Sequence, residues 1–359
     1  MTDSLVSLET ELIRIPLSRT WGPDVREIHI IVVRVRSSFG HLGTGFSWTP
    51  SIGAHAVRAM LDHDIAAHVI GGSIDPARVW IDLWHHLHEA GTGGVTTIAM
   101  AGLDLALYDL QAKSRSLSVV DLLGRRRDSV PVYGSGVNLH YSLDELVAQV
   151  SRWVAAGVDG VKVKVGKADL SEDLDRVAAV RETLGAGPRL MIDANQRWDL
   201  CTARTAIAAL SRFDLQWVEE PLLADDTAGY IELRSSVDVP LAAGENAHTE
   251  YRFRDLIEWG ALDIVQPNVV RVGGITPFQK IVGFARDHGI QVAPHLLPEL
   301  SGQLALTMLD EVWVEDVEDA RFEQLGALAA PSGVRIDRGR LTASTGAGLG
   351  LEFCQPLFI

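Results

Sequence analysis

The 359-residue sequence contains only two cysteines, Cys201 and Cys354. Two thiols cannot build the disulfide framework that stabilises small secreted domains, so we expect a protein of a reducing compartment, the cytoplasm. Long apolar runs are also missing, because no stretch reaches the roughly 18 residues that a membrane-spanning helix needs. We also find no low-complexity segment and no obvious flexible linker.

Positive charge is in the minority. Lys and Arg total 32 against 47 Asp and Glu, which gives a formal net charge of −15. A surface with this excess of negative charge is a poor match for nucleic acid or for an anionic membrane. A small anionic substrate remains compatible, because a local group of cations can oppose the net charge. We therefore expect a small-molecule partner and neither a nucleic-acid nor a membrane partner.

From about residue 130 onward, short apolar runs alternate with segments of helical periodicity. This pattern is typical of a parallel sheet whose strands are joined by helices, and the regular recurrence of eight runs favours a closed barrel over an open sheet. After the first run, Ser142 and Glu145 form a capping-box pattern that predicts the start of a helix. The eight strands are expected to begin near residues 130, 160, 189, 215, 239, 262, 290 and 311.

The first 125 residues have a different pattern. Alternating β segments over 28–48 precede two or three predicted helices, the last of them near 95–114. We therefore expect an α/β protein with an α+β domain over 1–125 and a barrel over 126–324. The tail, about 325–359, is glycine-rich and is expected to pack back on the first domain and complete it.

Acidic residues follow three successive strands of the predicted barrel. The third, fourth and fifth strands end in Asp193, Glu219 and Glu245, and the C-terminal ends of barrel strands form the floor of the active site. Three close carboxylates would repel one another unless a cation balanced them, and ligands that are all oxygen favour Mg²⁺, with Mn²⁺ as the alternative. In another interpretation, each acid pairs with an arginine or caps the next helix.

The second strand carries two lysines in the run VKVKV. Side chains alternate faces, so Lys162 and Lys164 share one face, which we expect to point into the barrel while the valines pack outward on helices. A lysine beside a second lysine and near a metal has its charged form disfavoured, so its pKa falls and it can act as a general base. Lys164, nearer the strand end, is the predicted base, and Lys162 is predicted to neutralise a substrate carboxylate.

The opposite side of the barrel carries Asn268, His295 and Glu315 at the ends of the sixth, seventh and eighth strands. A histidine after a strand is often structural. Here His295 lies opposite the lysine strand, which predicts an acid or base on the second face of the reacting carbon.

Together these positions resemble the enolase superfamily, specifically its mandelate racemase subgroup, over essentially the whole chain. The resemblance implies an N-terminal capping domain on a modified TIM barrel, (β/α)₇β, with Mg²⁺ on Asp193, Glu219 and Glu245. It also implies removal of the proton α to a carboxylate through an enediolate, with no organic cofactor. The motifs that carry it are K-x-K (Lys162, Lys164), D-A-N (193–195), E-E-P (219–221) and G-E-N (244–246).

The resemblance also implies roles for single residues. Lys164 matches the base, His295 the opposite-face group, and Glu315 an acid that hydrogen-bonds the enediolate, which requires that burial keep Glu315 protonated. Ser135 and Asn195 match substrate-contact positions. Proteins of this group generally associate, so we expect a homo-oligomer.

Asn268 departs from the pattern, because the subgroup usually has an aspartate there. An amide can accept a hydrogen bond from the imidazole N–H but cannot stabilise the imidazolium, so His295 is expected to be more often neutral at pH 7. A neutral His295 argues against a two-base racemase in particular, and less strongly against a dehydratase.

Dehydration of a sugar acid to a 2-keto-3-deoxy acid is therefore the predicted reaction. The alternatives are a racemase or epimerase of an α-substituted carboxylate and, in another class, a non-catalytic binding scaffold. Selectivity is expected from segments 18–24 and 45–50 of the capping domain, where Trp21 and Trp48 would close over the substrate. Gly43 and Gly45 would permit motion of the second segment, unless they serve a β-turn.

Overall fold

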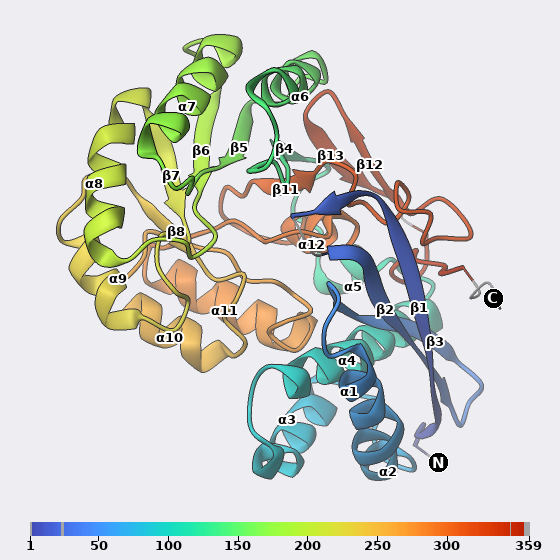
Figure 1. Cartoon of the computed structure of the whole chain (residues 1–359). Helices are drawn as coiled ribbons and strands as arrows, with labels where there is room; N and C mark the ends of the chain where they lie inside the picture. The colour runs from blue at the N-terminus through green and yellow to red at the C-terminus, as the bar shows by residue number, and fades with distance from the viewer. Residues whose placement is uncertain (1, 23–24, 345, 355–359) are drawn as a thin grey trace.

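The N-terminal part of the chain is built on an antiparallel sheet of three strands (Figure 1). The computed structural model describes residues 2–22, 25–344 and 346–354. The long strand β1 (Leu5–Trp21) pairs with β2 (Val25–Ser37), which pairs in turn with β3 (Leu42–Thr49). The two segments predicted over 28–48 are confirmed, whereas β1 was not predicted. Its burial alternates only weakly, and its pairing with the buried β2 decides its conformation.

Helices cover one face of this sheet, and α4 (Val95–Ser114) packs closest to it. Gly43 and Gly45 lie within β3, where a Cβ atom would collide with the carbonyl groups of Ala106 and Gly102 on α4. The two glycines therefore allow close packing of α4 on β3, and both interpretations of them, as a hinge and as a β-turn, are wrong. The helical segments are α1 (Ala54–Ala59), η1 (Met60–Ile65), α2 (Ala66–Val69), α3 (Pro76–His86), η2 (His88–Ala90), α4 (Val95–Ser114) and α5 (Val119–Leu123).

Eight parallel strands follow, and a helix comes after each of the first seven, so the (β/α)₇β architecture is confirmed. The ladder runs from β10 through β9, β8, β7, β6 and β5 to β4, and β11 pairs with β4 from the other side. The strands are β4 (Val130–Ser135), β5 (Gly160–Lys164), β6 (Arg189–Asp193), β7 (Leu215–Glu219), β8 (Leu241–Ala243), β9 (Ile264–Val265), β10 (Gln291–Val292) and β11 (Val314–Val317). All eight lie where the sequence predicts them.

The barrel helices bury their apolar sides against these strands. In the first of them, Leu146, Val150 and Trp153 are buried, and the predicted capping box of Ser142 and Glu145 is present. Among the described residues, none of the helices has both the length and the apolar character of a membrane span. The helices are α6 (Leu143–Ala155), α7 (Leu170–Leu184), α8 (Leu200–Leu210), η3 (Ser211–Phe213), α9 (Thr227–Arg234), α10 (Glu250–Glu258), α11 (Ile275–Asp287) and α12 (Pro298–Ala305).

The C-terminal tail contacts both parts of the molecule. Its hairpin, β12 (Val334–Asp337) and β13 (Arg340–Ala343), pairs antiparallel with the barrel strand β4. The following segment meets the N-terminal part, where Phe353 packs on Phe46, and Arg125 donates to the Ala343 carbonyl at the end of β13. The tail was predicted to pack back on the first domain. Its last segment does so, whereas β13 extends the barrel sheet beyond β4, a pairing that was not predicted. The boundaries 1–125 and 126–324 stay predictions.

Contacts of α3 and α4 with the barrel hold the N-terminal part beside the barrel mouth. Trp80 on α3 donates its indole N–H to the Gly273 carbonyl at 3.0 Å. Asp104 on α4 accepts hydrogen bonds from the backbone N–H and the hydroxyl of Thr276, at 3.1 and 2.6 Å. Since Thr276 lies in the first turn of α11, a side chain of the capping domain caps a barrel helix.

Candidate active site

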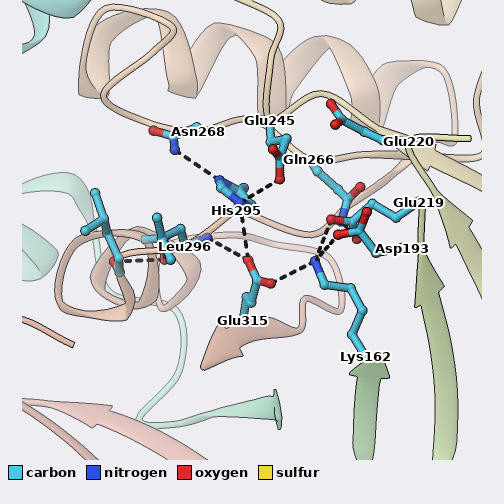
Figure 2. A network of polar contacts seen from close by, with 12 residues as sticks. Lys162, Asp193, Glu219, Glu220, Glu245, Gln266, Asn268, His295, Leu296 and Glu315 are labelled. Atoms are coloured by element: carbon cyan, nitrogen blue, oxygen red, sulfur yellow. Dashed lines mark hydrogen bonds and ion pairs between the residues drawn. The ribbon is translucent and has the colours of Figure 1, made fainter. Parts of the chain in front are cut away.

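Three carboxylates meet at the C-terminal ends of neighbouring barrel strands (Figure 2). Asp193 and Glu219 end β6 and β7 and are directly opposite in the ladder, and Glu245 follows β8. One oxygen of each carboxylate lies within 4.8 Å of the others. Oxygen ligands at this spacing fit Mg²⁺, which takes one or a few carboxylates and completes its shell with water and substrate. The structure brings the predicted ligands together, and their role as ligands stays a prediction.

The partners of these acids are lysine and histidine. Lys164 Nζ lies 2.5 Å from Asp193 Oδ2, Lys162 Nζ lies 2.5 Å from Glu219 Oε1, and His295 Nε2 lies 2.8 Å from Glu245 Oε2. In the described part of the chain, no arginine forms an ion pair with the three carboxylates. The alternative in which each acid pairs with an arginine is therefore wrong for these three residues.

Lys162 lies beneath the cavity, with 1% of its side chain exposed. It contacts Glu219, Glu315 at 2.7 Å and Asp193 at 3.6 Å. Burial favours the neutral amine, but the charges of Glu219 and Glu315 outweigh it and raise the pKa of Lys162 well above its usual value. Lys162 therefore balances the acids of the barrel floor. It is not among the residues that line the cavity, and its predicted role in neutralising a substrate carboxylate stays a prediction.

Lys164 does line the cavity, and the ladder places it beside Asp193. Its burial is the largest single effect and favours the neutral amine, but the carboxylates of Asp193, Glu245 and Glu219 together outweigh it, and the pKa of Lys164 is raised. The sequence predicted a lowered pKa, which presumed that a metal ion balances the acids. Without a metal ion, the charge of Asp193 stabilises the ammonium form of Lys164.

The hydrogen bonds of Asn268 decide which nitrogen of His295 carries a proton. The amide oxygen accepts from the backbone N–H groups of Val270 and Arg271, at 3.1 and 3.3 Å, so the NH₂ group faces His295 Nδ1 at 3.0 Å. Nδ1 must therefore accept, and the proton of the neutral ring is on Nε2, which faces Glu245. The sequence predicted the opposite direction, with the amide accepting from the ring.

Two effects on His295 oppose each other. Burial lowers the pKa of the ring, whereas Glu245 and Glu315 raise it, and the raising effect is larger. Asn268 acts toward the neutral form, because an imidazolium would place its Nδ1–H against the amide NH₂ donor. The expected neutrality of His295 is thus favoured by Asn268 and opposed by the two carboxylates.

Glu315 is ionised in this arrangement, contrary to prediction. Its burial would raise the pKa of the carboxyl, but Lys162 at 2.7 Å and His295 at 3.7 Å lower it to about 2. The backbone N–H of Leu296 also donates to it, at 3.0 Å. The prediction considered burial and missed Lys162 as the counter-charge.

Two residues that the sequence interpretation did not identify bind Glu219. The indole N–H of Trp217 and the amide of Gln266 both donate to Glu219 Oε2, at 3.1 and 2.5 Å. Trp217 lies two positions before Glu219 on β7 and therefore on the same inward face of that strand, and Gln266 lies two positions before Asn268 in the segment that follows β9. That alternation was the available signal.

A cavity of about 170 Å³ opens above this network. The four predicted substrate-contact residues, Ser135, Asn195, Trp21 and Trp48, all line it together with the reactive groups Lys164, Glu245, His295 and Glu315. Pro23 and Asp24, the end of the predicted segment 18–24, lie outside the described residues. Pro50, the last residue of the predicted segment 45–50, lines it too. The lining residues that were not predicted are Gly136, Val137, Arg271, Leu296 and Val317.

Comparison with known proteins places the chain in a family. Residues 5–124 match the N-terminal domain of mandelate racemase / muconate lactonizing enzyme, and residues 145–356 match the enolase C-terminal domain-like family. The 3,6-anhydro-alpha-L-galactonate cycloisomerase of Streptomyces coelicolor is 36% identical over 82% of this chain and 83% of its own length. The L-talarate/galactarate dehydratase of Salmonella typhimurium is 37% identical over 92% of this chain and 81% of its own length.

A solved structure agrees with this placement. L-talarate dehydratase from Polaromonas sp. JS666, complexed with Mg and L-glucarate, is 37% identical and superposes with a TM-score of 0.89, covering 98% of this chain and 96% of its own. The matches to both domains, the (β/α)₇β barrel and the three clustered carboxylates lead to one conclusion. The chain belongs to the mandelate racemase / muconate lactonizing enzyme family of the enolase superfamily.

Proposed function

We propose that this protein is a Mg²⁺-dependent enzyme that removes the proton α to the carboxylate of a sugar acid and expels the β-hydroxyl, giving a 2-keto-3-deoxy acid. The observation that carries the proposal is the placement of Lys164 and His295 on one cavity beside three clustered carboxylates. Relatives named as dehydratases of galactarate and talarate, arabinonate and galactonate support the choice of reaction.

Asp193, Glu219 and Glu245 would hold the metal ion. When bound, Mg²⁺ supplies positive charge where negative charge develops on the substrate carboxylate. Lys162, Trp217 and Gln266 fix the Glu219 carboxylate from below, so little rearrangement of this residue is needed.

Lys164 is the base of the proposed reaction. Its amine takes the α proton, and the C–H electron pair passes into the carboxylate to give the enediolate. Lys164 loses its charge partner when Asp193 binds the ion, so its pKa falls toward the range in which a neutral amine is available.

His295 faces the same cavity through Nε2. In the second step the enediolate collapses, the β C–O bond breaks, and the leaving oxygen takes the electron pair and a proton from Nε2 to depart as water. Glu315, which would not hold the ion, lies 3.7 Å from His295 Nε2, and its charge favours the protonated ring that this step needs. The resulting enol then takes up a proton at C3 and loses its O–H proton from C2 to become the 2-keto acid.

A racemase or epimerase is the second candidate. In that reaction His295 must take a proton at Nε2, which requires the neutral ring to carry its proton on Nδ1, against the Asn268 NH₂ donor. The dehydration leaves the same Nδ1–H tautomer once Nε2 has given up its proton, so Asn268 opposes both reactions and does not decide between them. The relatives named as dehydratases favour dehydration, and a relative named as L-Ala-D/L-Glu epimerase supports the second candidate. A homo-oligomeric state and a cytoplasmic location stay predictions.

The test is turnover of an acid-sugar library with Mg²⁺, detected as 2-keto acid. Lys164→Ala is expected to lower kcat by at least about a thousandfold and His295→Asn by about a hundredfold, which is the range of general acid–base catalysis. Appearance of α-deuterium in recovered substrate in D₂O, without keto acid, would favour the racemase. A chain that binds no Mg²⁺ at millimolar concentrations would favour the binding scaffold.

A further inference from the structure

The backbone of Lys164 needs a hydrogen-bond partner that β4 does not supply. Over the described span of both strands, the ladder between β4 and β5 pairs Gly134 with Val161 and does not reach Lys164. On its other side Lys164 lies opposite Asp193 of β6, and the next N–H, of Val165, donates to the Asp193 carbonyl at 2.9 Å. The barrel sheet therefore holds this end of β5 from the β6 side.

The side chain of Asn138 makes the contact that β4 does not make. Asn138 lies in the loop after β4 and is fully buried. Its amide oxygen accepts a hydrogen bond from the Lys164 N–H at 2.9 Å. Because Gly136 and Val137 of the same loop line the cavity, Asn138 joins the cavity wall to the strand that carries the predicted base.

The Asn138 amide continues on its other side into a chain of polar groups. Its NH₂ donates to Gln149 Oε1 on α6 at 2.9 Å, and the Gln149 NH₂ donates to Glu318 at 2.6 Å. Both amides have a fixed direction, because a backbone N–H can only donate and a carboxylate can only accept. Gln149 is buried, whereas Glu318 is partly exposed and pairs with Arg152 at 3.0 Å. The chain thus runs from the protein surface to the backbone of Lys164, with every donor facing an acceptor.

The loop that carries Asn138 is held in place by two further residues. The guanidinium of Arg176 on α7 is buried and donates to the carbonyls of Asn138 and Tyr141, at 2.8 and 2.9 Å. Gln149 also packs tightly on the loop, since a Cβ atom at Gly136 would lie 2.6 Å from its Nε2 atom. Asn138 therefore presents its amide oxygen at a fixed place.

We propose that Asn138 is a positioning residue for Lys164, and that the chain through Gln149 and Glu318 fixes the direction of its amide. By holding the N–H of Lys164, Asn138 keeps the end of β5 in place. The amine of Lys164 is then held at the distance from the reacting carbon that proton removal needs. The proposal rests on the proposed function for the role of Lys164 as the base, whereas the hydrogen bond itself can be measured without turnover.

The first experiment measures amide hydrogen exchange by NMR in the full-length protein. The sequence has five lysines, so labelling with ¹⁵N-lysine gives five backbone amide signals, and Lys164→Arg identifies that of Lys164. In Asn138→Ala the Lys164 amide should exchange at least about tenfold faster, because its acceptor is lost. The other four lysine amides are internal references and should keep their rates. Unchanged exchange of the Lys164 amide, or an equal rise for all five amides, would overturn the proposal.

The second experiment measures turnover of the acid sugar that the library screen identifies. Asn138→Ala should lower kcat by at least about tenfold and leave KM within about threefold, because the base is displaced while the substrate contacts remain. A raised KM with unchanged kcat would mean that Asn138 only supports the cavity wall, and would overturn the proposal. Gln279→Ala changes an exposed amide on α11 and should leave both constants unchanged.

A double variant tests the direction of the chain. In Asn138→Asp one carboxylate oxygen still accepts from the Lys164 N–H, but the other faces the acceptor Gln149 Oε1. Gln149 must then turn its amide, which brings Oε1 against the Glu318 carboxylate. Adding Glu318→Gln supplies an NH₂ donor there, so the double variant should have a kcat within about threefold of the wild type, well above that of Asn138→Asp alone. Equal kcat in the single and double variants would refute the role of the chain.

These results separate the inference from the proposed reaction. If the Lys164 amide loses protection in Asn138→Ala while no acid yields a keto acid, the hydrogen bond stands and the proposed function fails. If acids are dehydrated while Asn138→Ala changes neither the exchange of the Lys164 amide nor kcat, the proposed function stands and the inference fails.

Discussion

Asp104 joins the two parts of the molecule, and its charge state should make their association depend on pH. The side chain is 3% exposed, and both of its oxygens accept hydrogen bonds from Thr276 at the start of α11. Burial raises the pKa of Asp104 from 3.8 to about 7, although these hydrogen bonds oppose the change. In Asp104→Asn, the amide oxygen can accept from the Thr276 N–H and the NH₂ can donate to its hydroxyl. The variant therefore mimics the protonated acid.

The magnitude follows from the two pKa values. A rise from 3.8 to about 7 corresponds to about 4 kcal/mol between the two protonation states. Because the folded protein keeps a proton that the unfolded chain loses, the contribution of Asp104 to stability is full below pH 3.8 and is lost as the pH rises to about 7. Between pH 5 and pH 8, the wild type should lose about 2–3 kcal/mol relative to Asp104→Asn.

Urea unfolding of the wild type and of Asp104→Asn at pH 5 and pH 8 measures this difference. Because the two proteins share all other titrating groups, the effects of those groups cancel in the comparison. Asp238→Asn, a change of an exposed aspartate, provides the control and should track the wild type. Parallel stability curves for the wild type and Asp104→Asn would refute the reasoning. That result would mean that the N-terminus of α11 already keeps Asp104 ionised in the folded protein.

Two further predictions concern the active site. Asn268→Asp places a carboxylate against His295 Nδ1, which lies 3.0 Å from the amide nitrogen in the wild type. The carboxylate should raise the pKa of the ring, so the alkaline limb of the kcat–pH profile should move up by about one pH unit. An unmoved limb would contradict the role of protonated His295. Asp193→Asn removes one of the three clustered carboxylates. It should weaken Mg²⁺ binding by at least about a hundredfold in calorimetry, and the Mg²⁺-dependent rise in Tm should be lost. An unchanged affinity for Mg²⁺ would exclude Asp193 as a ligand.

Sequence patterns predicted the features that depend on neighbours along the chain. Strand alternation placed Lys162 and Lys164 on the inward face, and apolar runs located all eight barrel strands, because period and strand ends are local properties. The same regularity placed Asp193, Glu219 and Glu245 at one rim, since parallel strands of a barrel end on the same side. The pairing of β1 with β2 and the packing of α4 on Gly43 and Gly45 depend on distant segments, and local patterns missed both.

The sequence by itself determined which chemical groups reach the barrel mouth and which strands carry them. Only the tertiary structure decided their partners: Lys162 beneath Glu219 and Glu315, the NH₂ group of Asn268 toward His295, and Asp104 on the first turn of α11. The physical reason is that the charge of a buried group depends on atoms within a few ångströms, and folding brings these atoms from segments far apart in the chain. For that reason the sequence identified Glu315 but not its ionised state.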